Sequence, residues 1–523
     1  MSDLHWWQRS AIYQIYPRSF ADSNGDGVGD LRGIIDQLDY IDALGVGAIW
    51  LSPFYRSPMV DFGYDVADYT DVDPIFGTLD DFDALVAEAH RAGIRVVIDW
   101  VPNHTSDQHP WFVESRSGPD SPRRDWYVWR DPAPAGGPPN GWQAAWGMGS
   151  AWTFDEQTGQ YYLHSFLPQQ PDLNWDNPDV ERAMHDVLRF WLRRGVDGFR
   201  IDVVQKIAKD PALGENQPDR PHDEDWPTIR DRLRQIRAVA HEFDDRMLAG
   251  EVYILDLPRL VNYVSSGDEL DLAHNFVFLR LPWDASAIRA SVEEFAELAG
   301  DVAWPAWFLS NHDHPRVASR FADEPATGDR RARVAAMLIT AMRGTPFVYQ
   351  GEELGLPDAE IPPDRVVDVD GRDPERAPIP WLPRSVAGPG AGFTSGQPWL
   401  PIVADADRLC VESQDADPDS TLAFSRALLA LRARLEALQG GAQRSIDAAP
   451  GLFCFLREGN DERVLVALNF SSDENPLELG EDLGAGGAVI ELSTSNERAL
   501  GPVELASLAL TPDEGLVVSL ANA

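Results

Sequence analysis

The chain has few cysteines, few lysines and no long apolar segment among its 523 residues. Its two cysteines, Cys410 and Cys454, show no metal-ligand spacing, so we expect reduced, structural thiols. No uncharged apolar run is long enough to cross a bilayer. The first residues, MSDLHWWQRS, do not combine a basic start, an apolar stretch and a small-residue cleavage site. These absences predict a soluble, cytoplasmic protein.

Basic residues are scarce relative to acidic ones. The sequence holds 44 Lys and Arg against 85 Asp and Glu, which gives a formal net charge of −41 at pH 7. Nucleic acids and anionic membranes bind clustered basic residues, so we expect neither as a partner. A neutral small molecule is compatible with this surface. The 18 tryptophans fill cores in most proteins, but their rings also stack on sugars.

Two common catalytic signatures are missing as well. No glycine-rich phosphate loop opens a helix after a strand, so nothing indicates nucleotide binding. No Gly-x-Ser-x-Gly elbow ends a strand, which leaves serine-hydrolase chemistry without support. We therefore expect no organic cofactor.

The sequence does contain a regular alternation of short apolar runs with segments of helical periodicity. Apolar residues recur with helical spacing from Leu31 to Leu44, where Gly45 follows as a stop, and again from Asp179 to Gly195. About eight strand–helix units predict an α/β fold, a closed (β/α)₈ TIM barrel with helices outside a parallel sheet. The expected strands are 11–16, 47–52, 95–101, 198–204, 247–253, 269–276, 307–311 and 345–350.

Two segments depart from this alternation. Residues 104–171 are rich in Trp, Pro, Gly and Asp and have little helical periodicity, which predicts an irregular insertion domain over one barrel mouth, after the third strand. Beyond residue 435, short strands follow one another without helices, which predicts a C-terminal all-β sandwich domain over 436–523. The catalytic barrel would then comprise 1–103 and 172–435.

The run GVDGFRIDVV places a charged pair in a mostly apolar strand. Because side chains alternate along a strand, Arg200 and Asp202 share one face. Active sites of (β/α)₈ barrels lie at the C-terminal ends of the strands, so a pocket is expected there. Other expected strands end in polar residues at the corresponding point: His104, Glu251, Asn311, His312 and Asp313.

Several carboxylates with arginine and histidine, in a chain without a cofactor signature, indicate glycosidic chemistry. That reaction needs one carboxylic acid to protonate the leaving oxygen. It needs a second carboxylate to attack the sugar or to activate water.

The motifs that carry these residues resemble glycoside hydrolase family 13, the α-amylase family. The segments DWVPNHTS, GFRIDVV, GEVY and FLSNHDHPR are similar to its four signature regions. The segments QPDLNW, GRDPERAPIPW and FTSGQPWLP are similar to its branch of exo-acting α-glucosidases and oligo-1,6-glucosidases. The resemblance covers nearly the whole chain. It implies a retaining mechanism with Asp202 as the nucleophile, Glu251 as the general acid/base and Asp313 as the stabiliser of the transition state.

The same resemblance implies a blocked pocket for one terminal glucose, and hence exo-action. In VDFGYDVADY, Asp61 and Tyr64 match the family pattern D-x-G-Y-D, so Asp61 would bind the non-reducing sugar and Tyr64 would stack beneath it. Asp65 would be structural. From GRDPERAPIPW we favour Arg372 over Arg376 as the arginine that binds sugar hydroxyls or Asp61. The other expected pocket residues are His104 and His312 on sugar hydroxyls, Phe166 and Gln170 at the border, and Arg200, which would hold Asp202 ionised.

The segment DSNGDGVGD is a candidate cation loop. Its glycines permit tight turning, and oxygen ligands recur at alternate positions. The loop is not a full EF-hand, because Gly33 stands where the closing glutamate belongs. A polar loop without metal is the alternative, while the family resemblance implies a structural Ca²⁺ or Mg²⁺. The ligands would be Asp22, Asn24, Asp26, the carbonyl of Val28 and Asp30.

Linkage preference and reaction outcome stay open. Val203 follows the expected nucleophile, and valine at this point of the branch is associated with α-1,6 linkages. The next residues, QKIAKD, depart from that pattern and hold the only two lysines, Lys206 and Lys209; residues 353–365 are also short for the subgroup. Lys206 would either reach a second sugar or be solvated. A sucrose-acting hydrolase or isomerase and an α-glucosyl transferase share the three carboxylates, whereas a non-catalytic relative would have lost them.

Overall fold

The computed structural model describes residues 4–217, 220–300, 302–478 and 487–521. Eight parallel strands pair in the order β11-β10-β9-β5-β2-β1-β13-β12. A parallel bridge between His274 and Ala306 joins the two ends of this sheet, so the predicted barrel is closed. The strands are β1 (Ile12–Ile15), β2 (Ala48–Leu51), β5 (Arg95–Trp100), β9 (Gly198–Ile201), β10 (Met247–Gly250), β11 (Leu272–Ala273), β12 (Ala306–Trp307) and β13 (Thr345–Tyr349).

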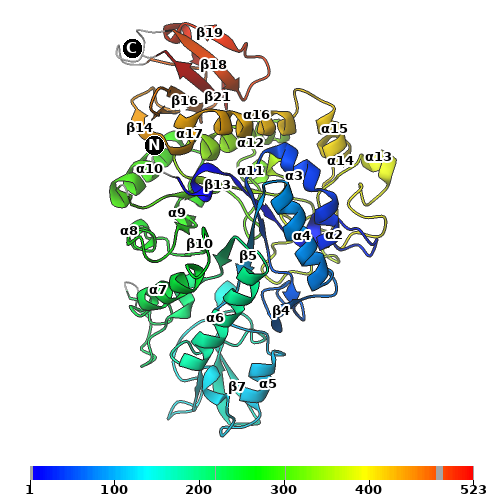
Figure 1. The fold of residues 1–523 in the computed structure, drawn as a ribbon, viewed down its shortest axis with the longest axis vertical. Helices are drawn as coiled ribbons and strands as arrows, with labels where there is room; N and C mark the ends of the chain where they lie inside the picture. Colours follow the sequence, from blue (N-terminus) through cyan, green and yellow to red (C-terminus); the bar gives the residue numbers. More distant parts are fainter. Residues whose placement is uncertain (1–3, 218–219, 301, 479–486, 522–523) are drawn as a thin grey trace.

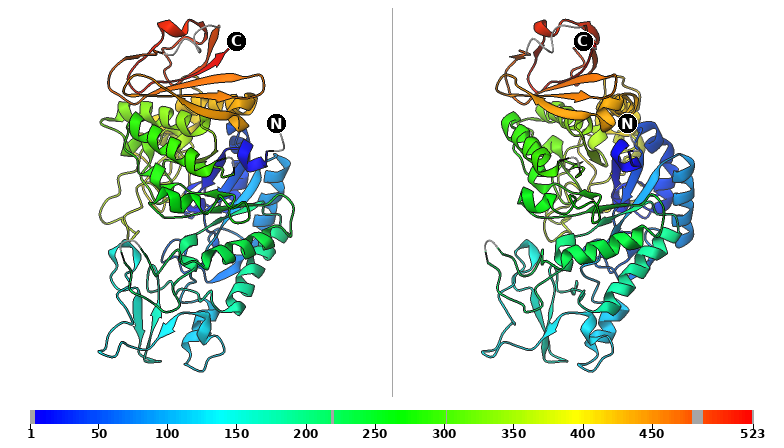
Figure 2. Two further views of the ribbon diagram at one scale, coloured as in Figure 1. Left: turned by 90° about the vertical axis from the view of Figure 1, so that its left-hand side faces the viewer. Right: turned by 60° about the vertical axis from the view of Figure 1, so that its left-hand side comes forward.

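Helices follow most of the strands and cover the outside of the barrel (Figures 1 and 2). The expected helix from Leu31 is two short helices, because Gln37 leaves helical geometry at φ −108° and ψ 11°. Gly45 ends the second one in the left-handed region, at φ +85°, as its position predicted. The main helices are α2 (Leu31–Asp36), α3 (Leu38–Leu44), α4 (Leu79–Arg91), α6 (Pro178–Arg193), α7 (Ile229–Ala240), α10 (Ala285–Ala299), α12 (Pro325–Ala341) and α16 (Thr421–Arg434).

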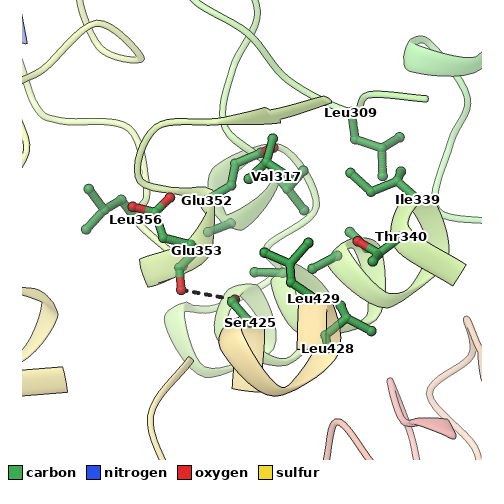
Figure 3. Close-up of a pocket in the computed structure, with 16 residues that line it drawn as sticks. Leu309, Val317, Ile339, Thr340, Glu352, Glu353, Leu356, Ser425, Leu428 and Leu429 are labelled. Carbon is green, nitrogen blue, oxygen red and sulfur yellow. Dashed lines mark hydrogen bonds between the residues drawn. The ribbon is translucent and has the colours of Figure 1, made fainter. Parts of the chain in front are cut away.

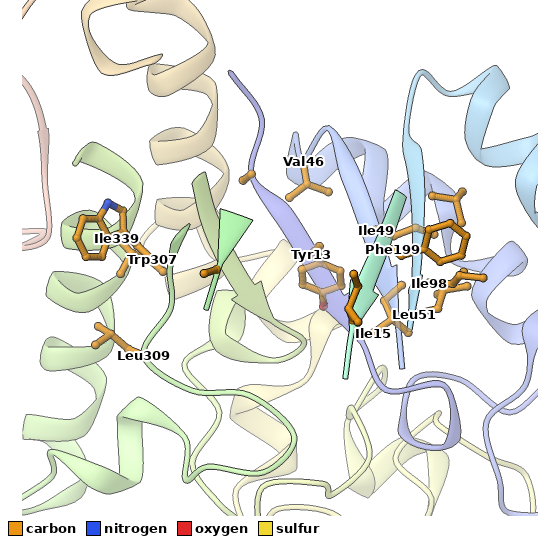
Figure 4. Packing of buried hydrophobic residues seen from close by; sticks show 14 of the residues in the cluster. Tyr13, Ile15, Val46, Ile49, Leu51, Ile98, Phe199, Trp307, Leu309 and Ile339 are labelled. Carbon is orange, nitrogen blue, oxygen red and sulfur yellow. The ribbon is translucent and has the colours of Figure 1, made fainter. Parts of the chain in front are cut away.

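The two faces of the strands bury different sets of side chains. Ile49, Leu51, Ile98 and Phe199 point outward and pack with the helices (Figure 4). A separate apolar cluster fills the inside of the barrel and includes Trp50. Because side chains alternate along a strand, β9 has an apolar outer face, and its charged residues point toward the barrel axis.

The insertion between β5 and α6 forms a small unit of its own. It contains α5 (Pro110–Arg116) and a three-stranded sheet with the order β6-β8-β7. Two tryptophans, Trp142 and Trp152, are buried in its core. The strands are β6 (Trp129–Arg130), β7 (Trp152–Asp155) and β8 (Gln160–Leu163).

The C-terminal part is antiparallel β structure, as predicted. A six-stranded sheet has the order β14-β15-β16-β21-β18-β19, and β17 pairs with β20. Both cysteines are buried and unpaired. Within the described ranges, no helix has the length and apolarity to cross a membrane. The strands are β14 (Ala442–Ile446), β15 (Leu452–Glu458), β16 (Arg463–Asn469), β17 (Asn475–Pro476), β18 (Ala488–Ser493), β19 (Gly501–Val503), β20 (Ala509–Leu510) and β21 (Gly515–Leu520).

Two buried arginines fasten this sheet to the barrel. Arg432 of α16 donates hydrogen bonds to the carbonyls of Thr340 and Gly344, each at 2.7 Å. Arg457 of β15 and Arg432 both donate to the carbonyl of Leu438, at 3.1 and 2.9 Å. Backbone carbonyls at the ends of helices thus gain charged donors where water is excluded.

We expect Arg432→Met to lower the free energy of unfolding by about 3 kcal/mol or more, because several buried carbonyls lose their donors. Urea denaturation and thermal shift would measure the loss. Arg434→Met is the matched control on the same helix: its side chain is 57% exposed and pairs with Glu491, so a change within about 0.5 kcal/mol is expected. Equal effects of the two substitutions would contradict this role.

Candidate active site

A cavity of about 520 Å³ opens where β9, β10 and β12 end. The three expected catalytic carboxylates line it together with five other expected pocket residues. Three further expected residues, Gln170, Arg200 and His312, lie behind this lining and hydrogen-bond to it. The expected residues in the lining are Asp61, Tyr64, His104, Phe166, Asp202, Glu251, Asp313 and Arg372.

Arg200 joins three carboxylates inside the barrel. Its Nη1 lies 2.6 Å from Oδ1 of Asp99 and 2.7 Å from Oδ1 of Asp202, and its Nη2 lies 2.7 Å from Oε2 of Glu251. The sheet register explains this arrangement, because Asp99 of β5 is the direct neighbour of Arg200 on β9. Asp202 and Glu251 follow directly after β9 and β10. One guanidinium, 1% exposed, therefore fixes carboxylates from three adjacent strands.

The excess of carboxylates in this cluster favours retention of a proton. Burial raises the pKa of Asp202 well above its ordinary value; Arg200 opposes the rise, while Glu251 and Asp99 add to it. Burial also raises the pKa of Asp99 to about 6, again against Arg200. The expectation that Arg200 alone holds Asp202 ionised is therefore not met: the guanidinium lowers the pKa of Asp202, but burial and the neighbouring carboxylates outweigh it. The cluster is suited to share a proton near neutral pH, which an acid catalyst requires.

Glu251 is oriented by donors from two sides. Its Oε2 accepts from Nη2 of Arg200 and from the backbone N–H of Val203, at 2.7 and 3.1 Å. Val203 has φ +35° and ψ 50°, a left-handed conformation that is strained for a β-branched residue. The strained residue is thus the one whose N–H contacts Glu251. Both donors address Oε2, so neither of them occupies Oε1.

Asp313 has the opposite electrostatic environment. Its Oδ1 lies 3.0 Å from Nη1 of Arg372 and 2.7 Å from Nη2 of Arg376. Burial would raise the pKa of Asp313, but His312, Arg372 and Arg376 outweigh it and hold the pKa well below its ordinary value. Asp313 is therefore a permanent negative charge beside the carboxylates that share Arg200.

A pair of opposite charges closes one end of the cavity. Nη2 of Arg372 lies 2.7 Å from Oδ1 of Asp61, and Nε2 of Gln170 donates to Oδ2 of the same carboxylate at 2.9 Å. Arg376 lies deeper and donates to the carbonyl of His312. All four side chains are at most 6% exposed. Arg372, of the two candidate arginines, is the one that contacts Asp61.

Rings form the wall of this closed end. Phe166 lies 5.2 Å from both His104 and Trp146, measured between ring centroids. The ring of Tyr64 stacks on His312, and its hydroxyl lies 2.7 Å from Nε2 of that histidine.

Burial lowers the pKa of His104 to about 4 and that of His312 to about 3. Both imidazoles are thus neutral at pH 7. The expectation that His312 binds sugar hydroxyls is not met, because its Nδ1 faces Gln14, its Nε2 faces Tyr64 and its side chain is fully buried. His104 lines the cavity, and His312 supports Tyr64 from behind.

Comparison with known proteins matches this architecture to one family. The family model described as "Alpha amylase, catalytic domain" matches residues 14–441. The chain belongs to the α-amylase family. A probable α-glucosidase of Rhizobium meliloti is 43% identical over 94% of each chain. A trehalose-6-phosphate hydrolase of Escherichia coli is 39% identical over 92% of this chain and 93% of its own. An oligo-1,6-glucosidase of Parageobacillus thermoglucosidasius is 35% identical over 98% and 99%.

Solved structures of the family extend the likeness to the whole fold. The isomaltulose synthase of Erwinia rhapontici has a TM-score of 0.93 at 35% identity, and the match covers all of both chains. Hydrolases and isomerases therefore share this scaffold, and the barrel alone does not distinguish them.

Sequence patterns missed several residues of this α-amylase family site. Asp368 accepts from Arg372 and Arg376 and holds both guanidinium groups. Trp146 lies over the guanidinium of Arg372, at 4.7 Å. Both come from irregular loops, where no period or spacing marks a residue as functional. Asp99 was within reach of prediction, because it occupies the inward-facing position of an expected strand, beside Arg200.

The candidate cation loop is held by its own hydrogen bonds. Both oxygens of Asp22 accept backbone N–H groups, and both oxygens of Asp30 accept within the same turn. Over the described ranges, no three Asp, Glu, His or Cys side chains are grouped to hold one metal ion. The oxygen-rich donor set suits a hard cation, and cation binding stays a prediction. Asn24 and Asp26 accept backbone N–H groups in the same way, and Val28 donates one.

A second hollow, lined mainly by apolar side chains of α12 and α16, lies away from the catalytic carboxylates Asp202, Glu251 and Asp313. It holds about 30 Å³, little more than one water molecule, and its walls include Leu309, Ile339 and Leu428 (Figure 3). Ser425 donates to the backbone carbonyl of Glu353 at its edge. This space is a packing defect rather than a substrate site.

We expect the imidazoles of His104 and His312 to remain neutral down to about pH 5, because their pKa values are near 4 and 3. Nitrogen-15 NMR of labelled protein measures the protonation of each ring. His104→Gln and His312→Gln would assign the two signals. A protonated ring at pH 6 for either residue would contradict the dry environment described above.

Proposed function

We propose that the chain is a retaining, exo-acting α-glucosidase that releases terminal, non-reducing glucose from short α-linked oligosaccharides. The observation that carries the proposal is the cluster in which Arg200 holds Asp202 and Glu251 together beside a closed, hydroxyl-binding end. In retaining glycosidases the two carboxyl groups are about 5 Å apart, and a shared guanidinium favours such a short separation. The named α-glucosidase and oligo-1,6-glucosidase relatives support the same activity.

In the first step, Asp202 would attack the anomeric carbon of the bound glucose. The bond from that carbon to the leaving oxygen breaks, and Glu251 gives its proton to that oxygen. Positive charge develops on the sugar ring, and the ionised Asp313 lies where it would stabilise that charge. The leaving sugar departs with its hydroxyl restored, and glucose is held as a β-ester of Asp202.

In the second step, water would replace the departed sugar. Glu251, now a carboxylate, takes a proton from this water while its oxygen attacks the anomeric carbon. The ester bond to Asp202 breaks, and α-glucose leaves. Two inversions give net retention. Arg200 stabilises Asp202 both before the attack and after its release.

The closed end accounts for exo-action. Asp61, Arg372 and Gln170 form a buried hydrogen-bonded group that leaves no passage for a longer chain on that side. Asp61 and Arg372 line the cavity and offer oxygens and nitrogens to hydroxyls of a terminal sugar, Gln170 supports Asp61 from behind, and Tyr64 offers a ring for one sugar face. A bidentate arginine discriminates by geometry as well as charge.

A second candidate reaction is isomerisation of sucrose or transfer of glucose to another acceptor. The observation that favours it is the likeness to the isomaltulose synthase over both whole chains. The two reactions share the glucosyl ester and differ in whether water or a sugar attacks it. Val203 supports α-1,6 linkages within the hydrolytic reaction. A cytoplasmic location and a neutral oligosaccharide as the sole partner stay predictions.

Proton NMR during the reaction tests the proposal. We expect α-glucose to appear first from a mixture of maltose and isomaltose, with isomaltose consumed faster if Val203 governs linkage. Asp202→Asn should abolish turnover while leaving the fold intact by circular dichroism, because the substitution removes the attacking charge and preserves the shape of the side chain. β-Glucose as first product, or full activity of this variant, would overturn the mechanism. No glucose but an isomer of sucrose would favour the second candidate.

We further propose that the loop from Asp22 to Asp30 binds Ca²⁺ or Mg²⁺ with a structural role. Removal of the cation with EDTA should lower the thermal midpoint by several degrees, and added Ca²⁺ should restore it. Asp26→Asn should remove the response, since one charged ligand is lost. A midpoint that is insensitive to chelator and to added cation would contradict the proposal.

A further inference from the structure

The only two lysines of the chain lie just beyond Asp202. They belong to the short 3₁₀ helix Val204–Ile207 and the residues after it. Nζ of Lys209 donates to Oδ1 of Asn103 at 2.7 Å and lies 3.0 Å from Oδ2 of Asp172, so it ties this helix to the insertion. It also donates to the backbone carbonyl of Lys206. Lys209 is therefore a structural anchor that fixes the backbone of Lys206.

Lys206 faces the cavity itself. Its Nζ lies 2.9 Å from Oδ2 of Asp223 and 3.0 Å from Oε2 of Glu224. Lys206 and Glu224 both line the cavity, whereas Asp223 is outside the lining. The side chains of Lys206 and Glu224 are 18% and 23% exposed, so both remain reachable.

The position of Lys206 and Glu224 relative to Glu251 indicates which part of the substrate these two residues contact. Val203, whose N–H contacts Glu251, accepts from the N–H of Lys206 one turn later. Glu251 must contact the oxygen between the two sugars, because it donates the proton there. With the terminal glucose held at Asp61, the cavity beyond Val203 is left for the leaving sugar.

The charge of the cavity indicates the kind of leaving group. Six carboxylates and three cationic side chains line it. The positive charge of Lys206 is already offset by two carboxylates. Four of the six carboxylates are Asp61 and the three catalytic ones, so the charge that the leaving group meets is set by Lys206 with its partners Asp223 and Glu224. A phosphate group would meet these two carboxylates beside the lysine, whereas sugar hydroxyls can donate to Glu224 and accept from Lys206.

We propose that Lys206 and Glu224 form the binding site for the leaving sugar and select a neutral sugar over a phosphorylated one. This inference rests on the proposed glucosidase function. It predicts a different substrate for the chain from the one that names the trehalose-6-phosphate hydrolase, which is 39% identical to it.

The test compares two substrates that differ only on the leaving side, 4-nitrophenyl α-glucoside and isomaltose or maltose. Glu224→Ala removes the partner of Lys206 that lines the cavity, and Asp223→Ala is the matched control that removes the partner outside it. Both variants leave Lys206 one carboxylate. The quantity compared is the kcat/KM for the disaccharide divided by the kcat/KM for the nitrophenyl glucoside. We expect Glu224→Ala to lower this ratio about tenfold, because one charged hydrogen bond to the leaving sugar is lost. Asp223→Ala should leave this ratio unchanged, and Lys206→Met should lower it.

The outcomes separate this inference from the function on which it rests. If the unmodified enzyme cleaves both substrates but the two alanine variants change the ratio equally, the pair is structural and the inference is overturned. If the unmodified enzyme cleaves neither, the glucosidase proposal itself fails. We also expect kcat/KM for trehalose 6-phosphate to be at least about tenfold below that for the preferred neutral disaccharide; a preference for the phosphorylated sugar would overturn the selectivity.

Discussion

One buried guanidinium determines the arrangement of the active site. Arg200 lies on the inner face of β9 and contacts carboxylates from β5 and from the ends of β9 and β10. Burying a charge is costly unless it is paired and hydrogen-bonded, so this arginine requires its carboxylates as much as they require it. The barrel supplies what the cluster needs, because adjacent parallel strands bring side chains of equal height to the same point.

The site divides into two electrostatic halves. Around Arg200, carboxylates outnumber the guanidinium, and burial raises the pKa of Asp202 and Asp99. Around Asp313, two arginines and a histidine lower its pKa instead. One fold thus keeps a proton available in one half and a permanent negative charge in the other. Glycosidic cleavage needs both conditions at once, an acid for the leaving oxygen and a negative charge for the sugar cation.

Strands and helices whose apolar residues recur at a regular spacing were predictable from the sequence. Seven of the eight barrel strands form within the expected apolar runs, and strand alternation places Arg200 and Asp202 on one face. The remaining strand, β12, is Ala306–Trp307 and shares only Trp307 with the expected run 307–311. Contacts made by loops were not predictable: Asp368 and Trp146 reach Arg372 from irregular segments, and only the folded chain brings them together. The break at Gln37 was also invisible, since apolar spacing continues across it and only its backbone angles depart from the helix.

Trapping the glucosyl ester would identify the nucleophile directly. The chain would be incubated with 5-fluoro-α-glucosyl fluoride, which slows the second step more than the first, and the digested protein analysed by mass spectrometry. If Asp202 is the nucleophile, a single added fluoroglucosyl group is expected on the peptide that contains Asp202, and none in Asp202→Asn. A label on another carboxylate would contradict the role of Asp202. Rapid turnover with no labelled peptide, together with a preference for β-glucosyl fluoride as substrate, would contradict the retaining mechanism on α-glucosides.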